Sequence, residues 1–121
     1  MMLYNNTRKV FIAEKVIMAD TMPLRLKGLL GRTSLSDDTC MMIVPCNSIH
    51  TFGMKFSIDV LFLDEKFKII NILENLKPRK TSPIIRNAKS VVEMQSSIVN
   101  KGKWEVGDIL QLMDENKYKG Q

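Results

Sequence analysis

Short apolar runs separated by turn residues predict β-strands along most of the chain. The first strand is expected over residues 9–18, with a bulge or turn at Glu14 and Lys15. The run at residues 58–63 is apolar at both alternating positions, which is typical of a central strand covered on both faces. The other runs with strand patterns lie at residues 40–44, 68–73, 90–94 and 108–113.

A single helix is predicted directly after the first strand. Thr21 is a suitable N-cap, and Pro23 falls in the first turn, where its missing N–H is not needed. Gly31 is expected to end the helix. The apolar stripe of this helix would consist of Met22, Leu26, Leu29 and Leu30.

Turns and loops divide these elements. Residues 64–67 predict the turn of a hairpin between the central strand and the next one. Residues 77–83 contain two prolines, which cannot donate to a sheet, and predict an exposed loop. The sequence contains no repeat, linker or low-complexity tract. We therefore expect a single domain over residues 1–121, with its core at about residues 9–113 and a polar tail at residues 114–121.

Length and composition agree with a globular protein. The 121 residues include 45% hydrophobic and 26% charged side chains, and such a chain buries roughly two thirds of its unfolded surface on folding. No apolar run approaches the roughly 20 residues that a transmembrane helix needs. The N-terminus is polar and basic where a secretory signal would be apolar, so we expect a cytoplasmic protein. Cys40 and Cys46 are then expected to be reduced.

The net charge of +5 favours encounters with polyanions but identifies no partner. A basic face that binds phosphate or nucleic acid would draw on Arg25, Lys27, Arg32, Lys77, Arg79, Lys80, Arg86 and Lys89. Proteins that bind single-stranded nucleic acid need aromatic residues interleaved with the basic ones. In this sequence most aromatic residues lie in apolar runs instead. We therefore expect a solvated basic surface and no nucleic-acid partner.

Six short segments match, in order and spacing, the pattern of one family of small bacterial and archaeal domains. The matching segments are residues 19–21 with Arg25, 28–32 (Gly-Leu-Leu-Gly-Arg), 48–55 (Ser-Ile-His-Thr-Phe-Gly-Met-Lys), 58–64, 91–94 and 107–108. On these segments, which extend over nearly the whole chain, the sequence resembles the family called domain of unknown function 192 (DUF192). The resemblance implies a compact α+β fold, with a curved, barrel-like, mostly antiparallel β-sheet and one or two short helices. It implies no particular activity or ligand.

The chain departs from that family pattern at several places. Many relatives have Trp-Met-Lys-Asn-Thr before the central strand, where this chain has Thr-Phe-Gly-Met-Lys at residues 51–55. Many also have a proline at the position of Ser57. An export signal that many relatives carry is absent here, which argues against a periplasmic role.

His50 is the one histidine of the sequence, so a site built from two or three imidazoles would need an oligomer. Cys40, Cys46 and His50 form a Cys-x5-Cys-x3-His run, and nearby methionines add soft ligands that suit copper(I) or zinc. The run lacks the Cys-x2-Cys pair of structural zinc sites. We therefore expect buried or half-buried thiols, with no metal and no cofactor.

The same two residues, Cys46 and His50, define an alternative function. An imidazolium near a thiol lowers the pKa of the thiol and favours the nucleophilic thiolate. In extended chain, however, two such residues would lie more than about 10 Å apart. We therefore expect a partly buried Cys46 and a hydrogen-bonded His50 at a strand end, and keep a small enzyme using this pair as the alternative.

Asp59 is a carboxylate inside the apolar central strand, where an unpaired charge is too costly to persist. In the structural interpretation, Lys55, Arg25, a threonine hydroxyl or backbone amides satisfy the carboxylate and hold the helix to the sheet. In the functional interpretation, Asp59 lies at the floor of a pocket lined by His50, Thr51 and Lys55.

Two acidic residues in the later motifs, Glu93 and Asp108, are interpreted as structural, and Asp108 is expected to accept hydrogen bonds from amides of its own glycine turn. The leading hypothesis for function is a non-catalytic module that binds a small molecule or a protein partner, as a monomer or small homo-oligomer. The candidate binding site consists of Arg25, Arg32, Cys46, His50, Thr51, Lys55 and Asp59.

Overall fold

The computed structural model describes residues 1–116, and most of its regular structure is β-strand. In chain order the elements are β1 (Met2–Asn5), β2 (Val10–Ala13), β3 (Lys15–Ala19), α1 (Met22–Lys27), β4 (Thr39–Ile43), β5 (Ile58–Leu63), β6 (Ile69–Leu76), β7 (Ser90–Gln95), the short 3₁₀ helix η1 (Ile98–Asn100) and β8 (Leu110–Met113). Residues 117–121 of the predicted polar tail lie outside the described residues. No helix within residues 1–116 is long and apolar enough to cross a membrane.

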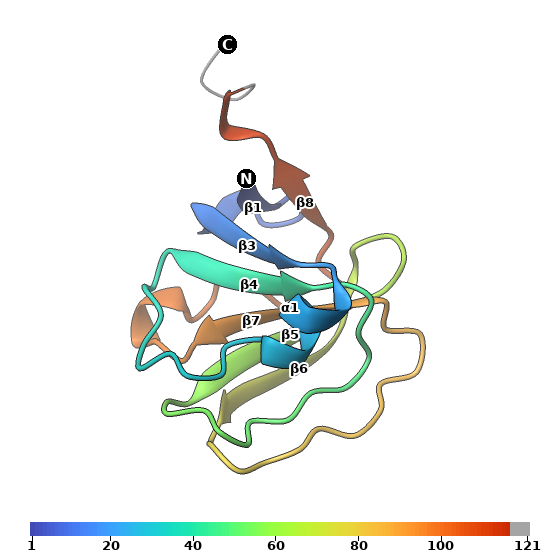
Figure 1. The fold of residues 1–121 in the computed structure, drawn as a ribbon. Helices are drawn as coiled ribbons and strands as arrows, with labels where there is room; N and C mark the ends of the chain where they lie inside the picture. Colours follow the sequence, from blue (N-terminus) through green and yellow to red (C-terminus); the bar gives the residue numbers. More distant parts are fainter. Residues whose placement is uncertain (117–121) are drawn as a thin grey trace.

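The strands form two sheets (Figure 1). A three-stranded antiparallel sheet has the order β2–β1–β8, and a five-stranded sheet has the order β3–β4–β7–β5–β6. In the larger sheet β3 and β4 are parallel, while the other neighbouring strands are antiparallel. The expected β-rich α+β fold is therefore confirmed, with its strands divided between two sheets that do not close into a barrel within the described residues.

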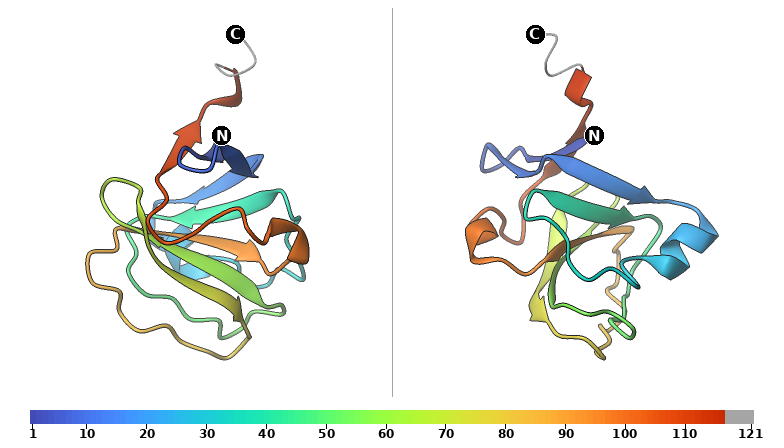
Figure 2. Two further views of the ribbon diagram at one scale, coloured as in Figure 1. Left: turned by 180° about the vertical axis from the view of Figure 1, so that it is seen from behind. Right: turned by 60° about the vertical axis from the view of Figure 1, so that its left-hand side comes forward.

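The strand predicted over residues 9–18 is two strands in different sheets. The chain turns at Glu14, whose backbone N–H donates to the carbonyl of Asp38 (2.8 Å), so β2 joins the smaller sheet and β3 the larger. The bulge or turn expected at Glu14 and Lys15 therefore marks a change of sheet. The pattern gave no indication of β1, which pairs with both β2 and β8 at one end of the molecule (Figure 2).

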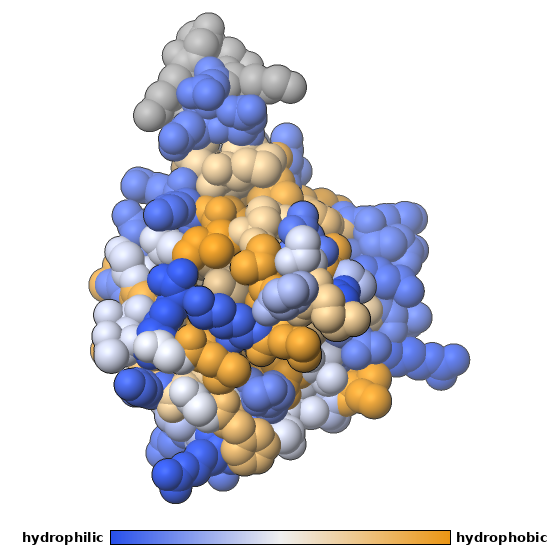
Figure 3. All heavy atoms as spheres, in the orientation of Figure 1, coloured by the Kyte–Doolittle hydropathy of each residue, from blue (hydrophilic) through white to orange (hydrophobic). Residues whose placement is uncertain are grey.

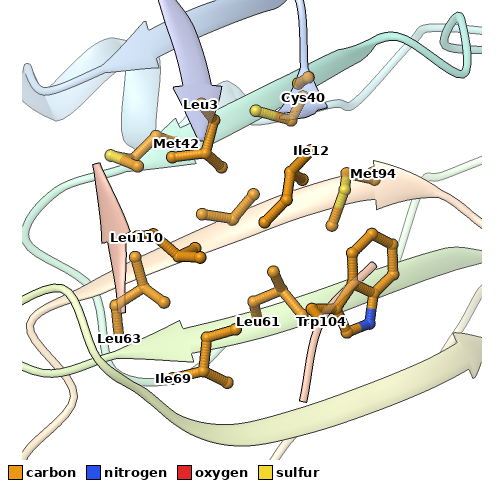
Figure 4. Packing of buried hydrophobic residues seen from close by; sticks show 12 residues of the cluster. Leu3, Ile12, Cys40, Met42, Leu61, Leu63, Ile69, Met94, Trp104 and Leu110 are labelled. Carbon is orange, nitrogen blue, oxygen red and sulfur yellow. The ribbon is translucent and has the colours of Figure 1, made fainter. Parts of the chain in front are cut away.

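Two apolar cores lie on the two faces of the five-stranded sheet. The first core fills the space between the sheets, and its side chains point toward one another from both of them (Figure 4). The second core lies on the other face, where the segments after α1 and β4 and before β7 cover the sheet. Members of the second core include Leu29, Leu35, Met41, Ile43, Ile49, Met54, Val60 and Val91. Because both faces are covered, all six residues of β5 are buried, as expected of the predicted central strand.

The alternation of side chains along β7 assigns its residues to these cores. Val92 and Met94 belong to the first core, and Val91 belongs to the second. Glu93 follows the same alternation, since its partners across the sheet are Met41 and Val60, both in the second core. The Glu93 side chain therefore lies on the face of the sheet that α1 and the loops cover.

The helix is shorter than its pattern predicts. Thr21 makes no side-chain cap, and α1 ends at Gly28, whose φ of +48° suits glycine, instead of at Gly31. No residue of α1 is buried, while Leu29, just beyond its end, is 1% exposed. The apolar stripe is thus split, because Met22 and Leu26 remain 61% and 70% exposed. Apolar residues accordingly gather in the middle of the face on which α1 lies, with hydrophilic residues among and around them (Figure 3).

Candidate functional site

A pocket of about 240 Å³ lies between α1, the end of β4 and β7. We call it the α1 pocket. Its apolar wall is formed by Met22, Leu26, Leu29, Leu30, Ile43, Ile49 and Met54. Its polar side chains are Arg25, Lys27, Cys46, Ser48, His50 and Glu93. The volume lies just below the range of about 300–1,000 Å³ that is usual for drug-sized ligands, so the pocket suits a smaller molecule.

Glu93 is the most unusual residue of the α1 pocket. Its side chain is 4% exposed, yet no group within residues 1–116 forms a hydrogen bond or an ion pair with its carboxyl group. Burial raises the pKa of Glu93 from 4.5 to about 7, because the charged form loses its hydration. Near neutral pH the carboxyl group therefore exists in both protonation states, and in either state it can serve a group that enters the pocket.

The sequence interpretation of Glu93 as structural did not anticipate its position in the wall of the α1 pocket. Asp59 was singled out because it is an acidic residue inside an apolar strand. Glu93 has the same feature, since it lies between Val92 and Met94. An alternating pattern shows that such a side chain is buried, but it does not show which face of the sheet the side chain occupies.

Cys46 lines the α1 pocket together with the acidic Glu93 and the basic Arg25. Burial is the main cause that raises the pKa of this half-buried thiol; a backbone hydrogen bond at Ser48 lowers it, the charge of Glu93 raises it and the charge of Arg25 lowers it. The thiol donates a hydrogen bond to the carbonyl of Ser48 (3.1 Å). Both charges therefore act on one sulfur atom, although Glu93 and Arg25 form no ion pair with each other.

His50 is exposed and lines the same pocket as Cys46. Its backbone bridges to Thr81, and its ring lies 5.8 Å from that of Phe52, centroid to centroid. The loop thus brings Cys46 and His50 to one pocket, although extended chain would separate them. The electrostatic influence on the Cys46 thiol comes from Glu93 and Arg25, however, and burial favours its protonated form.

Cys40 lies away from this pocket. It belongs to the first core, beside Met42 and Met94, on the opposite face of the five-stranded sheet (Figure 4). Burial raises the pKa of Cys40 to about 12. The Cys-x5-Cys-x3-His run therefore does not converge on one point, and residues 1–116 contain no group of three or more His, Cys, Asp or Glu side chains that could hold a metal ion.

Asp59 does not lie at the floor of the α1 pocket, and this correction follows from strand geometry. Asp59 pairs with Met94 of the first core, so it points to the face opposite Glu93. Its Oδ1 accepts hydrogen bonds from the backbone N–H of Asn75 (2.8 Å) and the hydroxyl of Ser96 (2.8 Å). A backbone amide therefore satisfies Asp59, as one option of the structural interpretation expected, but the bonds connect β5 to β6 and to the segment after β7 and do not hold the helix to the sheet. Asp59 also lines a separate cavity of about 260 Å³.

Thr51 holds two loops together. Its buried hydroxyl donates to the carbonyl of Lys77 (2.6 Å) and accepts from the backbone N–H of Lys80 (2.9 Å). Thr51 therefore secures the loop predicted at residues 77–83, and it does not line the α1 pocket. Arg32 and Lys55 are exposed and line neither cavity. Of the predicted site residues, the structure thus brings three to the α1 pocket, namely Arg25, Cys46 and His50.

Asp108 has the structural role that the sequence predicted. Its Oδ2 accepts hydrogen bonds from the backbone N–H of Glu105 (3.0 Å), the amide of Asn5 (2.8 Å) and the guanidinium of Arg8 (2.7 Å). Arg8 also pairs with the exposed carboxylate of Glu105. This network connects β1 and the turn after it to the loop before β8.

The sequence matches the family model DUF192, described as "Uncharacterized ACR", over residues 3–112. The chain belongs to this family. A UPF0127 protein from Thermococcus sibiricus is 30% identical over 112 residues, which cover 88% of this chain and 71% of that protein.

Two solved structures share the fold of this DUF192 chain. One is a protein of unknown function from Novosphingobium aromaticivorans, with a TM-score of 0.77 and 19% identity, covering 92% of this chain and 82% of that one. The other, from Sinorhizobium meliloti, is described as a candidate transcription regulator and has a TM-score of 0.73 and 22% identity, covering 91% and 89%. At such identities the likeness shows the fold alone.

Four of the segments that carry the DUF192 resemblance meet at the α1 pocket. The first segment supplies Arg25, residues 28–32 supply Leu29, residues 48–55 supply His50 and residues 91–94 supply Glu93. The pocket is therefore built largely from family motifs that lie far apart in the sequence.

Proposed function

We propose that this DUF192 domain binds a small molecule in the α1 pocket and does not transform it. The observation that carries the proposal is the carboxyl group of Glu93, which is buried at the wall of the pocket and has no hydrogen-bonding partner within residues 1–116. Buried polar groups are nearly always hydrogen-bonded, and each exception calls for an explanation. A ligand that donates a hydrogen bond to Glu93 supplies that explanation.

The other deeply buried acids, unlike Glu93, have hydrogen-bond partners in the protein. Asp59 and Asp108 are as deeply buried as Glu93, and each accepts at least two hydrogen bonds from neighbouring residues. The cost of leaving a buried acid without partners is about 1–3 kcal/mol or more. At Glu93 no protein group within residues 1–116 offsets this cost, and the carboxyl oxygens are open to the pocket, where a ligand can reach them.

The chemistry of Cys46 favours binding over the alternative of a Cys–His enzyme. A catalytic thiol needs a lowered pKa, whereas burial and the charge of Glu93 raise that of Cys46. In the proposed function Cys46 is part of the pocket wall.

Methionine methyl groups can test the proposal by NMR. Met22 and Met54 line the α1 pocket, whereas Met42 and Met94 belong to the first core on the other face of the sheet. When a library of small fragments is added to methyl-labelled protein, we expect some fragments to shift the Met22 and Met54 resonances and leave those of Met42 and Met94 in place.

A pair of variants makes this test specific. Glu93→Leu replaces the carboxyl group with an apolar side chain that suits the surrounding core, so we expect a folded protein that no longer binds the fragments. Glu65→Leu, at an exposed turn, is the matched control and should bind as wild type does. The proposal is wrong if no fragment shifts Met22 or Met54, or if Glu93→Leu binds the same fragments equally well. A turnover that disappears in Cys46→Ser would instead favour the enzyme.

A further inference from the structure

The charges of the α1 pocket indicate what kind of molecule it accepts. Glu93 and Arg25 are both pocket residues, and both act on the Cys46 thiol, so an acidic and a basic group line one small volume close enough to affect the same sulfur atom. Neither group is neutralised by the other or by another charged side chain within residues 1–116. Among the described residues, the hydrogen-bond contact of the Arg25 guanidinium is a weak one of 3.5 Å, to the sulfur of Met22.

The rest of the pocket wall is apolar. Leu29, Ile43, Ile49 and Met54 are buried there, while Leu26 is exposed on α1 at the edge of the pocket. A ligand that fills the pocket must therefore offer an apolar group to this wall as well as polar groups to Glu93 and Arg25.

On the basis of the proposed function, we infer that the ligand is a small apolar zwitterion of the α-amino-acid class, whose ammonium group faces Glu93 and whose carboxylate faces Arg25. An apolar amino acid carries both charges close together and attaches its side chain to the same carbon atom. Its size agrees with a pocket of about 240 Å³, which is small for a drug-sized molecule.

Ligands with a single charge satisfy only part of this pocket. An apolar amine would pair with Glu93 but would leave Arg25, with Lys27 nearby, as uncompensated like charges. An apolar carboxylic acid would pair with Arg25 but would bring a second acidic group toward Glu93. The zwitterion is the arrangement in which each pocket charge meets its opposite.

Binding of the ammonium group should also depend on pH. Glu93 must be ionised to form a charge-assisted hydrogen bond, and its pKa of about 7 means that the proton has to leave when the ligand binds below this value. Affinity should therefore rise between pH 6 and pH 8. The other titratable or charged groups that face the pocket are Arg25, Lys27, Cys46 and His50.

Three molecules with one carbon skeleton separate the contributions of the two charges. Leucine carries both charges, 3-methylbutylamine lacks the carboxylate and 4-methylpentanoate lacks the ammonium group. In calorimetry with the full chain, we expect leucine to bind at least tenfold more tightly than either analogue. At pH 6 we also expect leucine binding to release a proton, seen as an enthalpy that depends on the ionisation heat of the buffer.

Variants assign each charge to its residue. Glu93→Gln keeps the shape of the side chain and should weaken leucine binding at least tenfold, with proton release abolished, while 4-methylpentanoate should bind at least as tightly as to wild type because a like charge is gone. Arg25→Met should weaken leucine binding to a similar degree, while 3-methylbutylamine should bind at least as tightly as to wild type for the same reason. Arg32→Met, an exposed arginine that does not line the pocket, is the control and should bind leucine as wild type does.

The outcomes distinguish this inference from the proposed function. If leucine and other apolar amino acids do not bind, or bind no more tightly than both analogues, while other fragments still shift Met22 and Met54, the zwitterion inference is wrong and the binding pocket stands. If no fragment shifts these methyl groups, both are wrong. Tight leucine binding that Glu93→Gln leaves unchanged would also overturn the inference.

Discussion

Glu93 and Asp59 lie on adjacent antiparallel strands of the five-stranded sheet and point to its opposite faces. Glu93 is paired in register with Val60, and Asp59 with Met94. Asp59 accepts two hydrogen bonds at one oxygen atom, whereas no group within residues 1–116 bonds to the Glu93 carboxyl group. Two buried acids in neighbouring strands thus have different environments: protein groups satisfy Asp59, whereas the carboxyl group of Glu93 lines the α1 pocket, which is why we propose Glu93 as the ligand-binding acid.

Replacement of Asp59 should reduce stability without affecting the α1 pocket. Asp59→Ala leaves the N–H of Asn75 and the hydroxyl of Ser96 without their acceptor, so we expect the free energy of unfolding to fall by about 1.5–3 kcal/mol. Urea denaturation measures this loss. Glu74→Ala, an exposed residue beside the same cavity, is the control and should change stability little. If Asp59→Ala also abolished fragment binding, Asp59 would not be independent of the α1 pocket on the other face of the sheet.

Glu93 should make the folded state less stable as the pH rises. The folded protein keeps the Glu93 proton up to about pH 7, whereas the unfolded chain loses it near 4.5. Between these values the folded state holds more protons, so the free energy of unfolding decreases with pH, by about 1.4 kcal/mol per pH unit at most, and levels off above pH 7. Glu93→Gln mimics the protonated acid, so it should match wild type near pH 4.5 and be more stable at pH 8.

Denaturation curves between pH 4.5 and 8 check this prediction, and the exposed Glu65→Gln serves as the control. Arg25, Lys27, Cys46 and His50 also face the pocket. Because histidine ordinarily ionises between pH 5 and 8, the comparison should be repeated in a His50→Asn background. Parallel pH profiles for wild type and Glu93→Gln would show that the acid is not held in a desolvated site.

Much of the fold followed from the sequence, because alternation of apolar residues reports burial directly. The central strand at residues 58–63, the hairpin turn after it and the loop at residues 77–83 were all predicted. The change of sheet at Glu14 was visible as a break in the pattern, but its meaning depends on contacts with Asp38 that no local pattern encodes. Similarly, β1 forms because β2 and β8 pair with it from distant parts of the chain.

The site was only partly predictable for a related reason. The predicted candidate site included Arg25, Cys46 and His50, which line one pocket, although extended chain geometry had favoured a separation of Cys46 from His50. Sequence reasoning could not choose between Asp59 and Glu93, because both are acids in apolar strands and the register between β5 and β7 decides which face each occupies. The sequence also could not show that the hydroxyl of Thr51 is occupied by hydrogen bonds to the loop around residues 77–83.

Asp108 should be important for stability. It is buried and accepts three hydrogen bonds, one of them from the charged group of Arg8. We expect Asp108→Ala to lower the free energy of unfolding by about 2–4 kcal/mol, because a partly buried guanidinium and two further donors lose their acceptor. Glu105→Ala removes only the exposed partner of Arg8 and should cost less than about 1 kcal/mol. If Asp108→Ala and Glu105→Ala lowered the free energy of unfolding equally, burial of Asp108 would not explain its contribution to stability.

The two cysteines should react with thiol reagents at different rates and respond differently to the pocket charges. Cys46 is half-buried, so we expect slow labelling of this thiol in the native protein, while Cys40 should react only after unfolding. At pH 8, where Glu93 is ionised, Glu93→Gln should speed labelling of Cys46 several-fold, because the charge that raises the pKa of the thiol is gone. Arg25→Met should slow labelling, since that guanidinium lowers the same pKa. Cys46→Ser identifies which thiol reacts, and unchanged rates in both charge variants would show that Glu93 and Arg25 do not meet at Cys46.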